Sequence, residues 1–487
     1  MLIFRTSSPQ TGPLGSPSYI PQEGSLSMKY GLFAKIALIF LVTLVLAAGL
    51  AQVSFLVSER MLRRDGVVAE IAASTARDQV LAGPVLVIPY TRIIKTLKPV
   101  DSNEEKMIEV EKRSSDRVLL LPAELDIQTR LNTEPVRRGL YQAVVFGASL
   151  AFKGRFAAEG APIQPGTNEQ IIYGEPRLMV GISDPRGILR APALHWAEQR
   201  LDFMPGTGEE RMANGIQARL QGLDLQQPWA ADFTFSLDLR GTQSLSVAPA
   251  GDATRITMRS GWPHPSFFGQ FLPEAREITP EGFTATWATT RLAANMDHYL
   301  NAYLRGNQGL NGLIGVRFIE PADSYVQSDR ALKYALLFIG LSFTAFFLFE
   351  VLKRLAIHPL QYGLTGAALV LFYLLLLSLS EHIGFASAYA IATAACVALV
   401  SYYLVYVLGG IGWGLGFGVL LGGVFGILYV LISLEDYALL AGSLTLFGFL
   451  ALAMVLTRKV DWYQLSDGLP GRRGQGASGA SAPPARG

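Results

Sequence analysis

The feature that most constrains this chain is a nearly uncharged stretch that begins at Ala331 and continues, with brief interruptions, to Thr457. It divides into segments of about 20 apolar residues, the length that crosses roughly 30 Å of hydrocarbon as an α-helix. Lipid offers no hydrogen-bond partner to a bare peptide group, so these segments are expected to be helices. The stretch predicts a helical transmembrane domain over 331–458, with spans near 332–352, 362–380, 385–408, 411–433 and 437–456.

A further apolar segment, Ile36 to Val57, lies near the N-terminus and follows Lys29 and Lys35. It has two interpretations. A cleaved signal peptide has an apolar core of about 7 to 15 residues and a small-residue cleavage site, which Gly49-Leu50-Ala51 could supply. The apolar run continues beyond that site, so we favour an uncleaved transmembrane anchor over residues 28–57.

The two ends of the chain are rich in Gly, Pro, Ser and Ala and lack hydrophobic periodicity. Such segments cannot bury enough apolar surface to fold. We therefore expect a disordered extension over 1–27, with Met28 as the natural start, and a disordered tail over 459–487.

Residues 58–330, between the anchor and the membrane domain, regain charges and are punctuated by Gly and Pro. Apolar and polar residues alternate at Val144–Phe152 and Phe233–Arg240, which is typical of half-buried strands. The predicted architecture is an N-terminal transmembrane helix, a large β-rich (α+β) domain and a C-terminal bundle of about five transmembrane helices. Further strands are expected at Arg117–Ile127, Arg177–Ile182, Thr254–Arg259 and Gly312–Ile319, and helices near Glu59–Val80, Glu274–Arg276 and Thr290–Arg305.

The charges of the short loops predict an orientation. Basic residues lie before the first span, after the second and after the last, and these three positions share one side of the membrane. Glu381 with His382 and Glu435 with Asp436 lie in the loops on the opposite side. Basic loops stay in the cytoplasm, so both termini are expected there and the β-rich domain in the periplasm. The basic residues are Lys29, Lys35, Lys353, Arg354, His358, Arg458, Lys459, Arg472 and Arg473.

Composition argues against several functional classes. The net charge is only +2, and no run of Lys and Arg with interleaved aromatic residues suggests a nucleic-acid partner. The single cysteine, Cys396, rules out an intramolecular disulfide and a cysteine-based metal site. No Walker loop, HExxH or GxSxG motif occurs. We expect no catalytic residue, no cofactor and no metal, and hence no enzyme.

The most distinctive motif outside the membrane segments is a proline-stiffened aromatic loop formed by Trp262, Pro263, His264, Pro265 and Phe267. It has two interpretations: a recognition loop for a glycan or a lipid head group, or a corner whose aromatic rings cap the β-rich core. We favour the core cap, because prolines hold such a segment extended and His264 has no evident partner for binding a metal.

Ionisable residues within membrane spans are functional candidates by default. Glu350 precedes Lys353 and Arg354 on one helix face, so an ion pair at the helix end is the simpler explanation. Glu381 and His382 could titrate or bind an ion. We favour the interpretation that they are loop residues at the head-group level. His358 belongs to the same group of interfacial candidates.

Glycine recurs every fourth residue at Gly410, Gly414, Gly418, Gly422 and Gly426. Such a ridge lets a neighbouring helix approach to backbone contact. Packing within the bundle is the favoured interpretation; a homodimer contact and a moving, gating helix are the alternatives.

Motifs spread along the chain resemble the CreD family of bacterial inner-membrane, cell-envelope-integrity proteins. The similar segments include Gly83–Tyr90, Arg138–Tyr141, Trp262–Phe267 with Phe271–Pro273, Leu348–Glu350, Ile357–Pro359 and Leu374–His382. The resemblance implies an inner-membrane location and a role in envelope integrity, linked to a two-component response and to tolerance of β-lactams. It implies no reaction. The segment Thr75–Arg77 departs from the family pattern, which has a Trp-Gly pair there.

We therefore expect a non-enzymatic inner-membrane protein whose periplasmic domain interacts with envelope components or other membrane proteins, in contact with the lipid bilayer. A homo-oligomer is compatible with this hypothesis. The first alternative is a transporter or lipid-handling permease that uses the C-terminal helices. The second is an envelope hydrolase, which would need a cleft with converging Asp, Glu or His side chains.

Overall fold

A computed structural model describes residues 26–99, 107–320, 323–353, 357–434 and 438–458. The chain forms two compact units: one comprises the residues up to Ser58 and those from Ser324 onward, and the other comprises Glu59–Asp323. The expected disordered segments 1–27 and 459–487 lie almost wholly outside the described residues.

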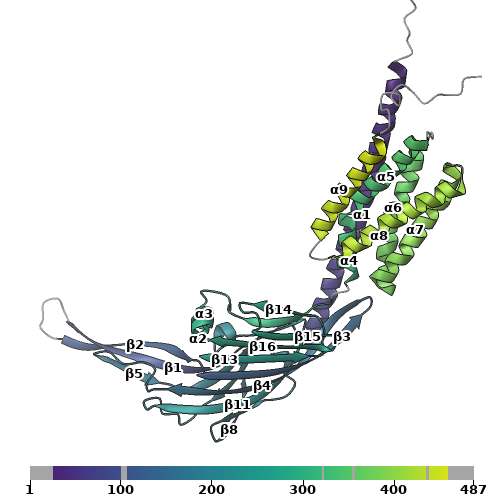
Figure 1. Cartoon of the computed structure of the whole chain (residues 1–487). Coiled ribbons are helices and arrows are strands. Elements are labelled where there is room, and N and C mark those ends of the chain that lie inside the picture. The colour runs from purple at the N-terminus through teal and green to yellow at the C-terminus, as the bar shows by residue number, and fades with distance from the viewer. Residues whose placement is uncertain (1–25, 100–106, 321–322, 354–356, 435–437, 459–487) are drawn as a thin grey trace, which may run out of the picture. The chain divides into compact units, whose positions relative to one another are not determined.

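The first unit is helical (Figure 1). It contains part of α1 (Leu26–Ser74) and six later helices: α4 (Ser324–Lys333), α5 (Ala335–Lys353), α6 (Pro359–Ile383), α7 (Phe385–Val407), α8 (Ile411–Ser433) and α9 (Ala438–Thr457). Among the described residues, five helices are long and apolar enough to cross a membrane, namely α1, α6, α7, α8 and α9. A sixth results if α4 and α5, bent by 48° at Tyr334, count together. The predicted span 332–352 lies almost wholly in α5.

Apart from α4, the helices of this unit are apolar around most of their surface, and aromatic side chains fill the space between them. Phe346, Tyr362, Phe372 and Phe417 are almost completely buried. Helix α1 joins the bundle through Leu46, which packs against α6 where Gly366 leaves room for it. Large apolar side chains elsewhere on the helices are exposed, as expected for surfaces that face lipid.

The second unit is built on two β-sheets. The larger, sheet A, has the order β14 (Pro265–Gly269), β17 (Ile314–Phe318), β12 (Ser244–Val247), β1 (Gln79–Pro99), β6 (Arg177–Ile182), β10 (Gly215–Arg219) and β9 (Met204–Pro205). Two further strands, β2 (Met107–Leu120) and β5 (Glu169–Tyr173), also pair with β1.

Sheet B has eight strands. Their order is β15 (Ala275–Thr279), β16 (Gly282–Thr290), β13 (Ala253–Ser260), β3 (Glu124–Arg138), β4 (Tyr141–Ala158), β11 (Trp229–Thr242), β7 (Ala193–Trp196) and β8 (Gln199–Asp202). Only the β3–β13 pair is parallel.

The inner faces of the two sheets share one hydrophobic core. Leu86 and Ile88 of β1 belong to the same buried cluster as Phe152 of β4 and Phe235 of β11. The rings of Phe152 and Phe235 stack with centroids 4.4 Å apart. Because strand residues alternate between faces, the apolar residues of β4 and β11 point inward and their polar neighbours point outward.

The outer face of sheet A is covered as well. Helices α2 (Arg291–Ala294) and α3 (Met296–Leu304) follow β16, and α3 buries Met296 and Leu300 against Val85 and Met179 of sheet A (Figure 1). The central part of sheet A is therefore apolar on both faces, whereas the outer face of sheet B exposes polar side chains.

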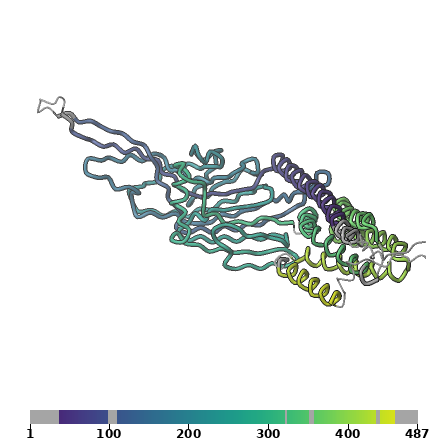
Figure 2. Tube along the Cα trace, turned by 90° about the horizontal axis from the view of Figure 1, so that it is seen from above, coloured from purple at the N-terminus to yellow at the C-terminus, as the bar shows by residue number. Residues whose placement is uncertain are grey.

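Strands β1 and β2 continue past the other strands as a long ribbon, with β5 beside its base (Figure 2). Their pairing extends from Leu86↔Leu120 to Pro99↔Met107.

The predicted strands at 144–152, 177–182, 233–240 and 254–259 lie within β4, β6, β11 and β13, and the helix expected over 290–305 is present as α2 and α3. The helix expected at Glu274–Arg276 is wrong, because Ala275–Thr279 pairs with β16 as the edge strand β15. The helix expected over 59–80 ends at Ser74, and β1 begins at Gln79.

Candidate functional site

The predicted recognition loop contributes its aromatic rings to the edge of the sandwich. Phe267 lies in β14, and its ring meets Phe283 and Trp287 edge to face, with centroids 5.5 Å and 5.6 Å away. The Trp262 indole nitrogen donates a hydrogen bond to the Ile319 carbonyl at 3.0 Å. These contacts support the core cap that we favoured.

The other members of the loop lie beside it. Pro263 and Pro265 are partly buried, and Pro265 begins β14. The His264 carbonyl accepts a hydrogen bond from the Ile319 amide, while the His264 side chain is exposed. His264 is thus the loop residue best placed to meet a ligand.

Glu350 is a buried carboxylate near the end of α5. Only 6% of the residue is exposed, and the Tyr362 hydroxyl donates to Glu350 Oε2 at 2.8 Å. The Tyr362 ring packs against Phe346 and Phe343. The predicted ion pair of Glu350 with Lys353 and Arg354 lies outside the described side chains. The hydrogen bond joins the end of α5 to the first turn of α6.

His358 has a structural task as the N-cap of α6. Its ring Nδ1 accepts a hydrogen bond from the Leu360 amide at 3.2 Å, and its own amide donates to Gln361 Oε1 at 3.1 Å. This reciprocal capping satisfies amides that the helix itself leaves without partners.

Glu381 and His382 occupy the last turn of α6 rather than a loop. The Tyr325 hydroxyl of α4 donates to Glu381 Oε1 at 3.1 Å, so Glu381 ties α4 to α6. His382 is exposed.

The five glycines of the ridge have different surroundings. A Cβ at Gly414 would overlap Val405, and a Cβ at Gly418 would overlap Ser401, both on α7. Gly422 and Gly426 have no atom within 4 Å of such a Cβ among the described residues, and Gly410 meets only Trp413 of its own helix. The close helix approach therefore uses two of the five.

A polar network holds the end of α1 against the sandwich. Asp184 accepts hydrogen bonds from the Arg186 side chain at 2.6 Å and 2.9 Å and from the Arg77 amide. Arg186 also donates to the Ala73 carbonyl of α1. Mainly through its bonds with Arg186, and against the effect of burial, the pKa of Asp184 falls to about 2. Gln79 extends the network by donating to the carbonyls of Asp184 and Arg240.

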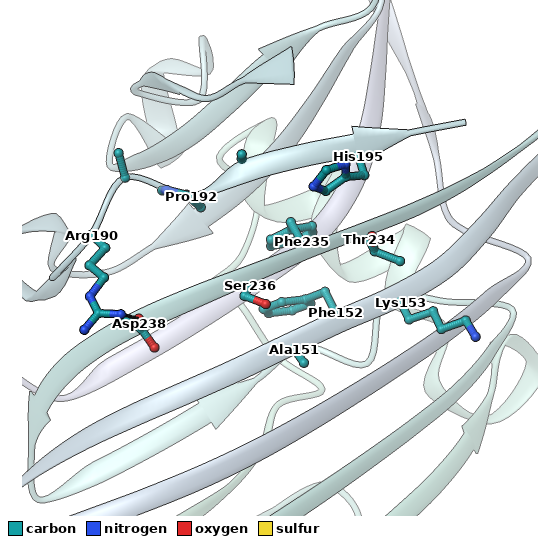
Figure 3. Close-up of a pocket in the computed structure, with 12 residues that line it drawn as sticks. Ala151, Phe152, Lys153, Arg190, Pro192, His195, Thr234, Phe235, Ser236 and Asp238 are labelled. Atoms are coloured by element: carbon teal, nitrogen blue, oxygen red, sulfur yellow. Dashed lines mark ion pairs between the residues drawn. The ribbon is translucent and has the colours of Figure 1, made fainter. Parts of the chain in front are cut away.

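Sheet B carries a depression of about 460 Å³ on its outer face, between β4, β11 and the chain that leads into β7 (Figure 3). Asp238 accepts a hydrogen bond from Ser149 at 2.8 Å and lies 3.6 Å from Arg190. His195 lies across from Thr234. Hydroxyls, one carboxylate and separated cations can hydrogen-bond a polar ligand.

The sequence indicated the outward residues of β11 but not this depression, because the pairing of β7 with β11 has no local signal. Within the described ranges, no three His, Cys, Asp or Glu side chains are grouped so that they could hold a metal ion.

Two comparisons with known proteins identify the same family, and each covers most of the chain. The sequence pattern of the family described as "Inner membrane protein CreD" matches residues 31–463. The inner membrane protein CreD of Escherichia coli strain K12 is 35% identical over 442 residues, which cover 90% of this chain and 95% of that protein.

Solved structures resemble only parts of the molecule. An M1 zinc metallopeptidase from Deinococcus radiodurans, bound to a Tyr-Ser-Ala substrate, matches 35% of this chain and 39% of its own, at 12% identity and a TM-score of 0.18. Leukotriene A4 hydrolase from Saccharomyces cerevisiae matches 40% of this chain and 28% of its own, at 10% identity and the same TM-score. Scores this low carry no argument about fold or activity.

The family match and the Escherichia coli relative each extend over both the apolar helices and the β-rich unit. This chain belongs to the CreD family of inner membrane proteins.

Proposed function

We propose that this protein supports the integrity of the cell envelope through non-catalytic contacts of its β-sandwich with envelope components. The observation that carries the proposal is the outer face of sheet B, whose polar side chains are exposed within the described part of the chain, in a protein that also has membrane-spanning helices. Membership of an inner-membrane family supports the location.

The proposal places the sandwich in the periplasm and both termini in the cytoplasm. The positive-inside rule supports this orientation, because Lys353 and Arg354 precede α6 in the sequence, whereas the sequence has no Lys or Arg at the junction of α6 and α7. A reporter enzyme that works only after export is expected to be active when it is inserted near Gly215, and a reporter that works only in the cytoplasm is expected to be inactive there. Activity of a cytoplasm-dependent reporter at that position would contradict the orientation.

The role itself is tested by deletion and complementation. Cells that lack the protein are expected to lose tolerance of β-lactams and detergents under envelope stress, and the full chain should restore it. Restoration by a chain without residues 59–323 would contradict a role for the sandwich, provided that immunoblots show equal amounts in the membrane.

A second candidate function is transport through the helices, which the buried carboxylate of Glu350 favours. If Glu350 binds a coupling ion, Glu350→Gln should abolish transport, while the hydrogen bond from Tyr362 can persist to the amide oxygen. Glu381→Gln, in the last turn of α6, is the matched variant, and it tests the alternative that Glu381 binds the coupling ion in the same assay.

A further inference from the structure

Two arginines lie side by side on the open face of sheet B. Arg259 of β13 is directly opposite Arg130 of β3 in the parallel pair. Their neighbours Met258 and Leu131 are buried in the core, so both arginines point outward, and both are exposed. Adjacent strands are only about 4.8 Å apart, which holds the bases of two cationic side chains together.

The pair has no compensating charge within contact distance. Among the described residues, neither Arg130 nor Arg259 has a carboxylate within 4.0 Å, although surface arginines such as Arg155, Arg190 and Arg291 do. Like charges opposite each other destabilise a sheet. Two steps along the same face, Arg255 lies opposite Asp126, the pairing that a purely structural surface would use.

The pair opens into a depression of about 460 Å³. Asn132, Ser260 and Thr284 line it beside the arginines, and Thr284 lies directly opposite Arg259. The arginines would thus supply charge, and the amide and hydroxyls would supply further hydrogen-bond donors, around one space.

Two acids, Glu277 and Glu281, line the far side of this depression. Glu277 lies opposite Thr284, and therefore two strands away from Arg259 and three from Arg130. At about 4.8 Å per strand, the backbone positions of Glu277 and Arg259 are roughly 10 Å apart, about the screening length of physiological salt. Glu277 thus tempers the attraction for anions but leaves the two guanidinium groups free to act together.

We propose that Arg130 and Arg259 form a binding site for a phosphoryl group, either on a soluble phosphate ester or on a lipid head group. A phosphate monoester carries close to two negative charges at pH 7, which match two guanidinium groups. Arginine presents parallel N–H donors that bind phosphate oxygens in bidentate fashion. A monocarboxylate has half the charge and binds more weakly.

The site goes beyond the proposed envelope role, because it names the chemistry that sheet B recognises. Its test in vitro does not depend on the orientation of the protein or on the phenotype of a deletion. Binding without an envelope phenotype would contradict the proposed function alone, and a phenotype without binding would contradict this site alone.

The test is isothermal titration of the full-length protein in an uncharged detergent at low ionic strength. The probes are glycerol 3-phosphate, short-chain phosphatidic acid and, as a monocarboxylate, acetate. We expect saturable binding of both phosphates and about tenfold weaker binding after either Arg130→Gln or Arg259→Gln, the loss of one charge-assisted contact. Equal affinity for the two phosphates identifies the phosphoryl group alone; tenfold tighter binding of phosphatidic acid identifies a lipid head group.

Three matched variants sharpen the result. Arg255→Gln removes the same charge from the same strand and should leave the affinity unchanged. Arg259→Lys keeps the charge but loses the bidentate geometry, so its affinity should lie between those of the wild type and Arg259→Gln. Glu277→Gln should tighten binding about twofold by removing repulsion.

The inference is overturned if the wild type binds no phosphate saturably, or if Arg130→Gln and Arg259→Gln bind as the wild type does. Equal weakening by Arg255→Gln would also overturn it, because it would reveal only a diffuse attraction to positive charge. Circular dichroism of each variant verifies the fold, which exposed substitutions of this kind leave intact in most proteins.

Discussion

The two outer faces of the β-sandwich differ in what covers them. On sheet A, α3 buries Met296 and Leu300 against the strands. On sheet B, the outward residues of β3, β11 and β13 are mostly polar, those of β4 are polar or small, and most of them are exposed. An antiparallel sheet can present one face to water, whereas a sheet buried on both faces must be apolar on both. Sheet A is thus built for stability, and sheet B leaves a surface available for binding.

The same difference is visible in the sequences of single strands. In β1, every residue from Leu81 to Ile88 is buried, without alternation, because sheet A has the core on one side and α3 with its neighbouring loops on the other. In β11, Phe233 and Phe235 are buried while Thr234 and Ser236 are exposed.

The largest expected effect is on the covered face. Leu300→Ala removes a fully buried side chain between α3 and sheet A and should lower the free energy of unfolding by about 2–5 kcal/mol. Leu292→Ala is the matched control, because Leu292 in α2 is 97% exposed and should lose almost nothing. Equal stability of the two variants in chemical unfolding would contradict the claim that α3 covers the outer face of sheet A.

Alternation predicted β4 and β11 of sheet B, because one buried and one wet face leave a period of two in the sequence. The single strand expected at Arg117–Ile127 is wrong, because this segment contains the end of β2 and the start of β3. The covering of sheet A was harder to predict, since a buried strand gives no sign of what lies on either side. The Arg130–Arg259 neighbourhood was not predictable, because it depends on the register of two parallel strands far apart in sequence. The edge strand at Ala275–Thr279 was mistaken for helix because its pairing with β16, rather than local propensity, decides its conformation.

The glycine ridge was predicted as a set, yet only one part of it is covered by a neighbouring helix. Gly418 faces Ser401, and Gly422 faces open space within the described residues. Gly418→Leu should therefore destabilise the helical unit by about 1–3 kcal/mol through overpacking. Gly422→Leu should be nearly neutral in the same detergent-unfolding assay. If Gly422→Leu instead disrupts a dimer, the result supports the homo-oligomer alternative, with this uncovered part of the ridge at the dimer contact.

The polar network beside sheet A predicts a dependence on pH. The pKa of Asp184 is about 2 in the folded protein, against 3.8 ordinarily, so its contribution is present above pH 4 and is lost as the pH falls towards 2. Because Arg186 is 55% exposed, we expect about 1–2 kcal/mol rather than the full value of the shift. Asp184→Asn should lower stability by this amount at pH 7.

Thermal unfolding of the wild type and Asp184→Asn between pH 2 and pH 7 checks the sign. The two curves should converge at low pH. A constant gap over the whole range would show that the carboxylate charge contributes nothing.

The smallest expected effect is on the open face. Arg259→Gln removes the repulsion from Arg130 and should stabilise the sandwich by about 0.2–1 kcal/mol in the absence of phosphate. Arg255→Gln, which removes an arginine opposite Asp126, should not stabilise it. Destabilisation by Arg259→Gln would show that a contact within the protein already compensates the pair.

The central claim is that the open face of sheet B is presented outside the inner membrane. Its most direct test is a single cysteine at Ser236, in a chain whose native Cys396 is replaced by serine, labelled with a membrane-impermeant thiol reagent on intact spheroplasts. Ser236 is exposed on the outer face of β11. Leu360→Cys, at the exposed start of α6, serves as the cytoplasmic control. The account predicts labelling at position 236 before lysis and at position 360 only after it; labelling at position 236 only after lysis would contradict the claim.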